Sequence, residues 1–457
     1  MSGIGDALLA ALGADLVLVG EAVPARNRTD WSGLPPGRPA ALVRPRTVED
    51  VSATLAACAR LGAAVVPQGG LTGLTGGAQP GDGEVALSLE RMSGVEEVDT
   101  AAATLTALAG TPLEVVQQAS AAAGFACGID LGARGSCTIG GNVATNAGGN
   151  TVIRYGMTRA SVRGLEVVLA DGRIVRSLNK MQKNNAGYDW TQLFIGSEGT
   201  LGVVTRVVLA LFPAPGERTT VLVAVPDFAA ALQLLRRVEA AVPGALLAFE
   251  AMWPDYLSFA AAVGRPAPLD WQRGLLVLLE AGTGGGPAAE HLAGTLEAAM
   301  GDGLVEDAVI ARSERERERL WAIREAPAEY RRYFSGVTGF DVSLPLGVMA
   351  EAVAALDRGI KRHFAEAMTL FYGHVADSNL HLVVHVPDAA PQPSHALDEI
   401  VYPIVAGLGG TVSAEHGIGR LKRPYLALSR SPDELALMRT MKAALDPHGI
   451  LNPGKVL

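Results

Sequence analysis

The chain has 457 residues, of which 49% are hydrophobic and 19% charged, and its formal net charge is −9. Chains of this length divide into two or three domains, and this apolar content is typical of packed globular proteins rather than disordered ones. The net negative charge argues against proteins that bind nucleic acid or anionic lipid surfaces.

The start of the chain predicts a short surface helix rather than a targeting segment. The first residues, MSGIGDALLAALGADLVLVG, begin without Lys or Arg and are interrupted by Asp6 and Asp15, whereas a secretory signal begins with basic residues. We expect no transmembrane segment, because no apolar run is long enough to span a bilayer. Cys58, Cys127 and Cys137 match no metal-binding spacing, so we expect a reduced, cytoplasmic protein.

Helices and strands alternate through the first part of the chain. Thr47–Leu61 has a capping threonine, acidic residues in the first turn and apolar residues at helical spacing, and therefore predicts a helix. A second helix is expected over Thr111–Ala123, closed by Gly124. Arg163–Val175 predicts a hairpin with an Asp-Gly turn. Further strands are expected at residues 63–68, 85–89, 94–98, 104–109 and 193–195.

Two glycine-rich segments punctuate this alternation, PQGGLTGLTGG at residues 67–77 and GIDLGARGSCTIGGNVATNAGG at residues 128–149. The second predicts a loop, because each glycine would cost about 1 kcal/mol in a helix. Glycine lets the backbone approach a ligand closely, so the pair suits a ligand with a pyrophosphate and a ring system. Each segment taken alone is equally compatible with a plain turn. Neither is a GxGxxG sequence entering a helix, which excludes a dinucleotide fold of the Rossmann type.

After the linker PAPG at residues 213–216, the pattern changes to that of a second domain. Strands are expected at residues 219–225, 246–251 and 275–280, with helices at 227–241 and 287–300. This order predicts a ferredoxin-like layer. A charged helix is expected over Ser313–Arg332.

Residues 371–385 predict a hairpin that brings His374 and His381 to one side. Together with Glu415, in the segment SAEHGIG, they form the two-histidine, one-carboxylate set that often binds a divalent metal. A single histidine is more often a structural or surface residue, and we apply that interpretation to His291, His363, His385, His395 and His448.

The amino-acid sequences of these segments resemble those of a known family. PQGGLTGLTGG, GSCTIGGNVATNAGG, RYGMTRASVRGLEVVLADG and LFIGSEGTLGVVT resemble the FAD-binding domain of the p-cresol methylhydroxylase and vanillyl-alcohol oxidase superfamily. YGHVADSNLH and SAEHGIGRLKRPYL resemble its D-2-hydroxyacid dehydrogenase branch, which includes D-lactate dehydrogenases, glycolate oxidase flavin subunits and D-2-hydroxyglutarate dehydrogenases. The resemblance extends from about Pro45 to Leu457.

The resemblance implies an α+β fold in three parts. Residues 1–215 would form a two-subdomain FAD-binding domain, residues 216–425 a ferredoxin-like substrate domain with a metal site, and residues 426–457 a segment that returns to the FAD domain. FAD would be bound without a covalent bond, because Leu71 and its neighbours include no His, Cys or Tyr. The residues expected to bind FAD are Pro67, Gln68, Gly69, Gly70, Leu71, Thr72, Gly73, Leu74, Gly135, Ser136, Cys137, Thr138, Gly140, Gly141, Asn142, Thr145, Asn146, Gly148, Gly149, Glu198, Gly199, Gly202, Val203 and Asn452.

The resemblance also assigns catalytic roles. His374, His381 and Glu415 would hold a zinc-like or manganese-like ion, and His416 would accept the substrate hydroxyl proton. Asn379, with Asp377, would orient ligands or contact the substrate, and Arg324 would bind the substrate carboxylate. The alternative for Arg324 is an exposed helix arginine. The catalytic set is therefore His416, Arg324 and Asn379.

Two departures from relatives bear on the substrate. Several relatives have a basic residue shortly before DVSLP, where this chain has Gly339 and Phe340. We therefore expect a small acid such as D-lactate, with D-2-hydroxyglutarate and glycolate as alternatives. Ala376 and Ser378 replace glycines of the usual turn.

Other functions stay open. A transferase like alkylglycerone-phosphate synthase is disfavoured, because this chain lacks that relative's run of histidines, and a non-enzymatic flavin subunit is a further alternative. The electron acceptor, which could be a quinone, a cytochrome, an electron-transfer flavoprotein or oxygen, has no readable motif, and the resemblance suggests a homodimer.

Overall fold

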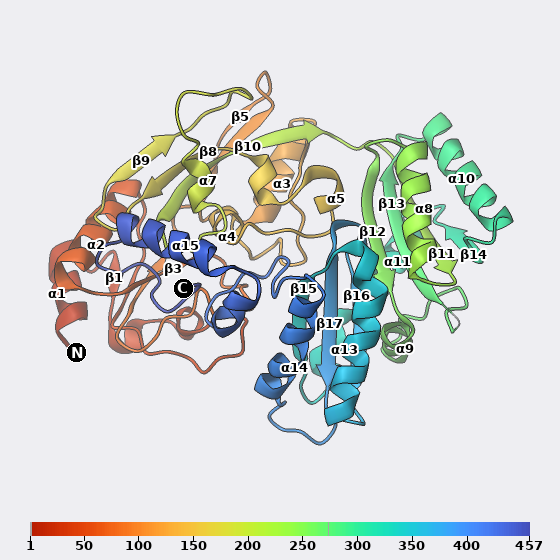
Figure 1. Cartoon of the computed structure of the whole chain (residues 1–457). Coiled ribbons are helices and arrows are strands. Elements are labelled where there is room, and N and C mark those ends of the chain that lie inside the picture. The colour runs from red at the N-terminus through yellow and green to blue at the C-terminus, as the bar shows by residue number, and fades with distance from the viewer. Residues whose placement is uncertain (1, 273) are drawn as a thin grey trace. The chain divides into compact units, whose positions relative to one another are not determined.

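The computed structural model describes residues 2–272 and 274–457, which form two compact units (Figure 1). The first unit runs to Gly149, continues over Tyr155–Ala214 and resumes at Glu415–Leu457. The second contains Asn150–Arg154 and Pro215–Ala414. The chain leaves the first unit at Ala214, inside the predicted linker. It returns to the first unit at Glu415, whereas we expected the return at residue 426.

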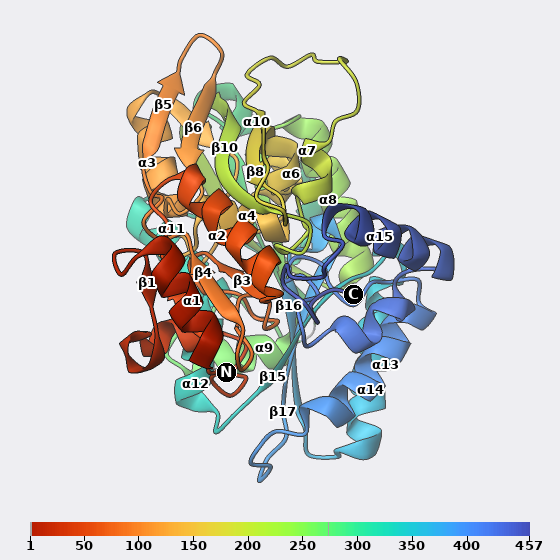
Figure 2. The same cartoon turned by 90° about the vertical axis from the view of Figure 1, so that its left-hand side faces the viewer.

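A four-stranded sheet begins the first unit, with the order β1-β2-β4-β3. Its strands are β1 (Val17–Leu18), β2 (Ala41–Val43), β3 (Val65–Gln68) and β4 (Val85–Ser88). Helices α1 (Ser2–Leu12) and α2 (Val48–Leu61) lie side by side next to it (Figure 2). The capping interaction predicted for α2 is present, because Thr47 accepts the N–H of Asp50 and Asp50 accepts the N–H of Thr47.

A six-stranded sheet forms the rest of this unit around one long strand, β10 (Val203–Pro213). β10 pairs in antiparallel fashion with β6, β7 and β8, and its buried residues join one core with those of both sheets. The other strands are β5 (Val95–Asp99), β6 (Thr104–Leu108), β7 (Phe125–Cys127), β8 (Val162–Val168) and β9 (Ile174–Ser177). The remaining helices of this unit are α3 (Leu113–Ala122), α4 (Ile139–Thr145), α6 (Thr158–Ser161), α7 (Thr191–Phe194) and α15 (Pro432–Leu445), whereas α5 (Val152–Tyr155) lies mostly in the segment that belongs to the second unit.

Two local predictions in this unit were wrong. The segment expected to be a loop contains helix α4, which packs on β10 and β6. Burial compensates for its poor composition, and Gly140 is needed there because a Cβ would lie 2.5 Å from the Cβ of Ala109. Residues 193–195 were expected to be a strand, but Thr191–Phe194 is the short helix α7. An apolar run of three residues does not distinguish the two.

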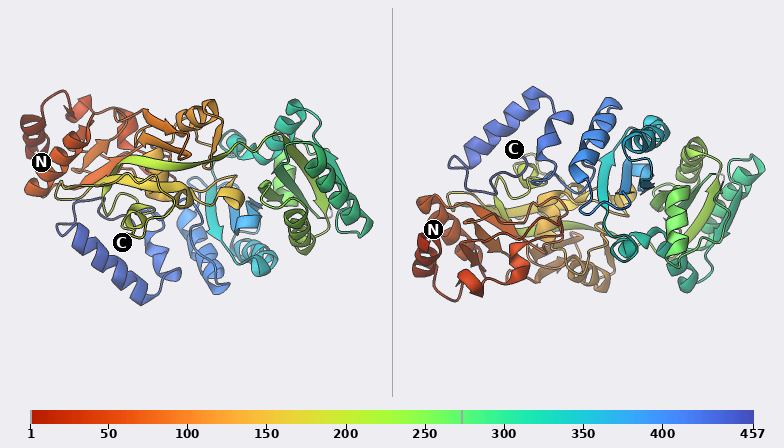
Figure 3. Two further views of the ribbon diagram at one scale, coloured as in Figure 1. Left: turned by 90° about the horizontal axis from the view of Figure 1, so that it is seen from above. Right: turned by 90° about the horizontal axis from the view of Figure 1, so that it is seen from below.

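The second unit is built on a seven-stranded sheet with the order β14-β11-β13-β12-β16-β17-β15. Its first four strands and helices α8 and α10 follow one another as strand–helix–strand–strand–helix–strand, which confirms the ferredoxin-like prediction. Helices α8 and α10 lie beside these strands (Figures 1 and 3). The strands are β11 (Arg218–Val225), β12 (Leu246–Met252), β13 (Leu275–Gly282), β14 (Asp307–Ile310), β15 (Thr338–Ser343), β16 (Met368–Gly373) and β17 (Asn379–His385).

The helices of the second unit are α8 (Phe228–Ala241), α9 (Pro254–Ala262), α10 (Gly286–Gly301), α11 (Glu314–Arg324), α12 (Tyr330–Tyr333), α13 (Met349–His363) and α14 (Ser394–Gly407). The single helix expected over Ser313–Arg332 is broken, because a 3₁₀ turn at Ala326–Glu329 containing Pro327 separates α11 from α12. Among the described helices, none combines the length and the apolar character that crossing a bilayer requires.

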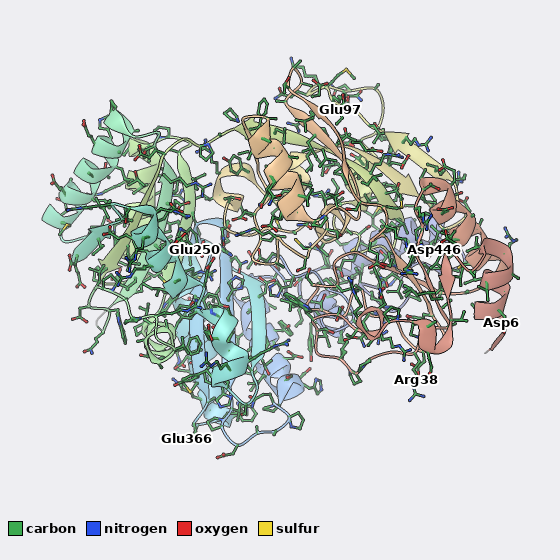
Figure 4. The ribbon with its side chains drawn as sticks, turned by 180° about the vertical axis from the view of Figure 1, so that it is seen from behind. Asp6, Arg38, Glu97, Glu250, Glu366 and Asp446 are labelled. Carbon is green, nitrogen blue, oxygen red and sulfur yellow. The ribbon has the colours of Figure 1, made fainter. Side chains whose placement is uncertain are left out.

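The carboxylate of Asp446 holds the C-terminal segment on the first unit (Figure 4). One oxygen accepts the N–H of Ile450 at 3.0 Å, and the other accepts the N–H of Leu451 at 2.8 Å and the ammonium of Lys442 at 2.5 Å. Lys442 also donates to the carbonyl oxygen of Thr200 at 2.7 Å. The buried Asp446 and the partly buried Lys442 therefore fix the last turn of α15 and the residues that follow it.

Replacing Asp446 with Ala would leave the Lys442 ammonium without its charged partner and two backbone N–H groups without an acceptor. We expect the free energy of unfolding to fall by about 3 kcal/mol, measured by urea unfolding followed by circular dichroism. Asp433→Ala, an exposed change on the same helix, is the control and should cost less than about 1 kcal/mol. Equal effects of the two substitutions would contradict the anchoring role.

Candidate functional site

The first unit contains a cavity of about 440 Å³ between its glycine-rich segments. Residues of both segments line it, from the strand end and loop at 67–78 and from the loop and helix α4 at 131–148. Residues 198–204, in the turn before β10, also line it. Glycine is required where the first two segments meet. A Cβ on Gly70 would lie 1.9 Å from the carbonyl oxygen of Ser136, and one on Gly69 would lie 2.4 Å from Thr138 Oγ1.

The cavity lining offers hydrogen-bonding groups to a ligand. Thr138 Oγ1 and Asn142 Oδ1 are buried, and neither atom has a hydrogen-bond partner among the described residues. Buried polar atoms are normally paired, so unpaired ones beside a cavity indicate a missing ligand or solvent. These atoms and the exposed backbone of the glycine loops fit a flat, polar-edged cofactor such as FAD.

Most residues expected to bind FAD line this cavity. The exceptions are Gly135, Ser136, Asn146, Gly149 and Asn452, which lie around it without lining it. Asn452 instead joins two parts of the lining, since its amide donates to the carbonyl oxygens of Gly77 at 2.9 Å and Glu198 at 2.7 Å. Trp31 and Thr75 also line the cavity and were not singled out in the sequence.

Glu415 and His416 belong to the same lining. Their ligating atoms lie within 4.8 Å of each other, and the hydroxyl of Thr75 lies 3.4 Å from the carbonyl oxygen of His416. The expected proton acceptor is therefore on the wall of the cavity that the glycine loops form. The sequence alone placed these residues more than 200 positions after the last glycine loop.

A second polar group lies on one face of the sheet of the second unit. Strand register places Tyr372 opposite His381, and His381 opposite Asp341, so the three side chains share one face. The rings of His374 and His381 are 5.3 Å apart between centroids. The predicted hairpin of β16 and β17 is therefore confirmed, and it brings the two histidines together.

Glu250, on the neighbouring strand β12, joins two of the predicted site residues (Figure 4). One carboxylate oxygen accepts a hydrogen bond from Arg324 Nε at 2.7 Å, and the other lies 2.6 Å from His374 Nδ1. Burial by itself raises the pKa of Glu250, but the adjacent charges of His374 and Arg324 outweigh burial and hold the pKa at about 2. Glu250 is therefore ionised and fixes both neighbours.

Arg324 is buried, with 8% of its surface exposed, so the alternative of an exposed helix arginine is wrong. Its guanidinium lies 4.6 Å from the centroid of the Tyr372 ring, and Nη2 lies 3.5 Å from His374 Nε2. The hydroxyl of Tyr256 donates to the carbonyl oxygen of Arg324 at 2.7 Å. Helix α11 ends at this residue and is in contact with α9.

Asp341 lies beside His381 and binds the backbone at the end of the second unit. Its Oδ1 is 3.9 Å from His381 Nδ1, and its Oδ2 accepts the N–H of Ala414 at 3.2 Å. Glu415 follows Ala414 directly in the chain, one peptide bond from this anchor.

Asn379 is buried, and its Oδ1 has no hydrogen-bond partner among the described residues.

The remaining histidines agree with a structural interpretation where their contacts are known. His385 Nδ1 lies 2.7 Å from the carbonyl oxygen of Gly336, and its ring packs on Phe334. His363 Nδ1 lies 3.1 Å from the carbonyl oxygen of Gly359.

Sequence reasoning missed Glu250 and the contacts of Asp341. The sequence did contain a signal for Glu250, since it is the single charged residue in the apolar strand LLAFEAM. A charge inside such a strand is buried only with a partner. Nothing local indicated that the partners would be His374 and Arg324.

Comparison with known proteins gives the following relatives. A family model described as FAD linked oxidases, C-terminal domain, matches residues 214–456, and one described as FAD binding domain matches residues 39–177. The mitochondrial D-2-hydroxyglutarate dehydrogenase of Bos taurus is 40% identical over 454 residues, which cover 97% of this chain and 83% of the bovine protein. The D-2-hydroxyglutarate dehydrogenase of Xanthomonas citri pv. viticola is 38% identical, covering 93% and 91%.

Solved structures share the fold. p-Cresol methylhydroxylase with bound substrate matches with a TM-score of 0.77 at 17% identity, covering 99% of this chain and 96% of that chain. An alkyldihydroxyacetonephosphate synthase matches with a TM-score of 0.75 at 17% identity, covering 99% and 84%. These likenesses confirm the expected α+β fold class, and at such identities they show the fold alone.

Gly70→Ala should lower the affinity for FAD about tenfold or more, because the new methyl group would collide with the Ser136 carbonyl and push the two loops apart. FAD titration of the cofactor-free protein, followed by fluorescence quenching, measures this affinity. Gly3→Ala, in the same unit, is the control, since Gly3 is exposed, does not line the cavity and has no atom within 4 Å of the position its Cβ would take. Equal loss in both variants would show that the close approach of the loops does not form the FAD site.

Proposed function

The chain belongs to the FAD-linked oxidase family, and from this membership we propose that it oxidises a D-2-hydroxy acid to the 2-oxo acid with FAD in the cavity of the first unit. The observation that carries the proposal is that His416 lines the cavity formed by the glycine-rich segments. The names of relatives that are 40% and 38% identical along most of the chain support the reaction class.

Oxidation of a secondary alcohol removes the hydroxyl proton and transfers a hydride from the adjacent carbon. FAD supplies the hydride acceptor when it is bound. We assign to His416 the role of accepting the hydroxyl proton, because an imidazole on the cavity wall can act as a general base. Thr75 is in place to hold the backbone of this residue, through its contact with the His416 carbonyl oxygen.

We assign to Arg324 the binding of the substrate carboxylate. Its Nε is bonded to Glu250 and its guanidinium plane is held against Tyr372, so the direction of its remaining N–H groups is fixed before a ligand arrives. A guanidinium with two free N–H groups on one edge binds a carboxylate in bidentate fashion. Burial strengthens that attraction relative to an exposed arginine.

His374, His381 and Glu415 are assigned a divalent ion, Zn²⁺ or Mn²⁺, with Asp341 as an additional carboxylate. Imidazole nitrogens and carboxylate oxygens are suitable donors for either ion. The Nδ1 of His374 is occupied by Glu250, as is common for metal-binding histidines, and this leaves Nε2 as the donor. Such an ion, when bound, lowers the pKa of a hydroxyl that it coordinates.

The glycine at position 339 favours a substrate with a short or apolar tail, such as D-lactate. This residue lies on β15 on the same face as Asp341, two residues away, and no atom lies within 4 Å of the position its Cβ would take. A basic side chain here would add a cation beside the site, and this chain has none at that position. The second candidate is D-2-hydroxyglutarate, which the names of the relatives favour.

Anaerobic bleaching of the bound flavin by a panel of D- and L-2-hydroxy acids tests this proposal. We expect D-lactate to reduce the flavin at least tenfold more efficiently than D-2-hydroxyglutarate, and the L-acids to leave it oxidised. Gly339→Lys should raise the efficiency with D-2-hydroxyglutarate about tenfold, because the new ammonium pairs with the second carboxylate.

Gly347→Lys is the matched control, since Gly347 is also exposed with open surroundings, and it should leave the preference unchanged. A wild-type preference for D-2-hydroxyglutarate would reject the short substrate in favour of the second candidate. A flavin that no acid bleaches would reject the dehydrogenase and favour a non-redox transferase.

Two histidine variants separate the metal ligand from the base. His381→Ala should lose both the ion and flavin reduction, whereas His416→Ala should keep the ion and FAD and lower the rate of flavin reduction by at least a hundredfold. Metal analysis and stopped-flow absorbance measure the two properties, and His448→Ala, an exposed change, is the control. Full activity of metal-free His381→Ala would remove the ion from the proposal, and an unchanged rate in His416→Ala would remove the base.

A further inference from the structure

Glu198 occupies an unusual place in the turn before β10. Its backbone angle φ is +52°, in the left-handed region that residues other than glycine rarely adopt. Its N–H donates to the carbonyl oxygen of Ala144 at 2.7 Å, and its own carbonyl oxygen accepts the amide of Asn452. A glycine would take this conformation without strain, which directs attention to what the side chain of Glu198 contacts.

The carboxylate of Glu198 binds the backbone of a distant segment. Oε1 accepts the N–H of Ile418 at 2.7 Å, and Oε2 accepts the N–H of Gly419 at 2.8 Å. These residues follow Glu198 by 220 and 221 positions. The two oxygens of one carboxylate therefore hold two successive backbone N–H groups. Gly417 must lack a side chain here, because a Cβ would lie 2.9 Å from Glu198 Oε1.

Neighbouring contacts hold the rest of this segment independently of Glu198. The carbonyl oxygen of Thr75 accepts the N–H groups of Arg420 at 2.8 Å and Leu421 at 3.1 Å, and the N–H of Val456 donates to the Gly419 carbonyl oxygen at 3.0 Å. The residues before Ile418 are Glu415, His416 and Gly417. Glu198 therefore binds the backbone two and three residues after His416.

We propose that Glu198 is a positioning residue, which fixes His416 on the cavity wall by binding the N–H groups of Ile418 and Gly419, rather than a residue that binds FAD through its carboxylate. This inference rests on the proposed function only for the role of His416. The anchoring itself depends on contacts within the first unit alone.

Amide hydrogen exchange in the FAD-bound enzyme tests the anchor directly. Glu198→Gln has one acceptor oxygen, and its NH₂ group would face the second N–H, so one bond is lost. We expect exchange at Ile418 and Gly419 to accelerate about tenfold or more. Exchange at Arg420 and Leu421, which Thr75 holds, should change less. Mass spectrometry of fragmented peptides spanning residues 415–421 gives these rates.

Kinetics test the consequence for His416. In Glu198→Gln we expect FAD to stay bound at one per chain, flavin reduction at saturating substrate to slow about tenfold, and KM to change less than threefold. Glu198→Asp keeps the charge on a shorter side chain and should fall between Glu198→Gln and the wild type in both measurements. It also serves as the test variant if Glu198→Gln does not fold.

Glu166→Gln is the matched control, because Glu166 is a buried carboxylate of the same unit whose partners are Arg176, Arg206 and Thr205. It should not accelerate exchange at Ile418 and Gly419. Loss of FAD from Glu198→Gln with unchanged exchange would overturn the inference and make Glu198 a cofactor ligand. Accelerated exchange with an unchanged rate would overturn its role in positioning His416. A wild-type flavin that no acid reduces would reject the proposed function, and the exchange rates would still decide the anchor.

Discussion

Two carboxylates, those of the buried Asp341 and the partly buried Glu198, bind the backbone on either side of Glu415 and His416. Asp341 accepts the N–H of Ala414, and Glu198 accepts those of Ile418 and Gly419. Ordering each backbone residue costs about 1–2 kcal/mol, so a polar segment without secondary structure stays fixed only where strong bonds offset that cost. Bonds from backbone N–H groups to these two carboxylates provide them, and the three residues between the anchors include the proposed metal ligand Glu415 and the proposed proton acceptor His416.

The second unit applies the same principle to side chains. Its sheet places Tyr372, His381 and Asp341 in one row, and Glu250 lies on the adjacent strand within reach of Arg324 and His374. A single buried ion is unfavourable, but here the carboxylate lies between the guanidinium of Arg324 and the imidazole of His374. The arrangement sets the direction of an arginine and of a histidine ring in advance, which is what binding a carboxylate and a metal ion requires.

The cavity of the first unit depends on the absence of side chains. Gly69 and Gly70 let one loop approach the other until backbone and hydroxyl groups face each other. This approach leaves Thr138 and Asn142 with polar atoms that no described residue satisfies. The same need for small residues produced helix α4, which has poor helical propensity and is stable because it is buried against β10 and β6.

The sequence by itself determined the features whose cause is local: the capped helix after Thr47, the hairpin that brings His374 near His381, the first glycine-rich loop and the ferredoxin-like strand order. It also identified His416 and Arg324 as candidates. Only the tertiary structure decided the partners of these groups. Glu250 lies 74 residues from Arg324 and 124 from His374, and Glu198 lies 220 residues from Ile418. A local pattern records which residues are polar, but the choice of partner depends on which strands become neighbours and on the cost of leaving a buried charge unpaired.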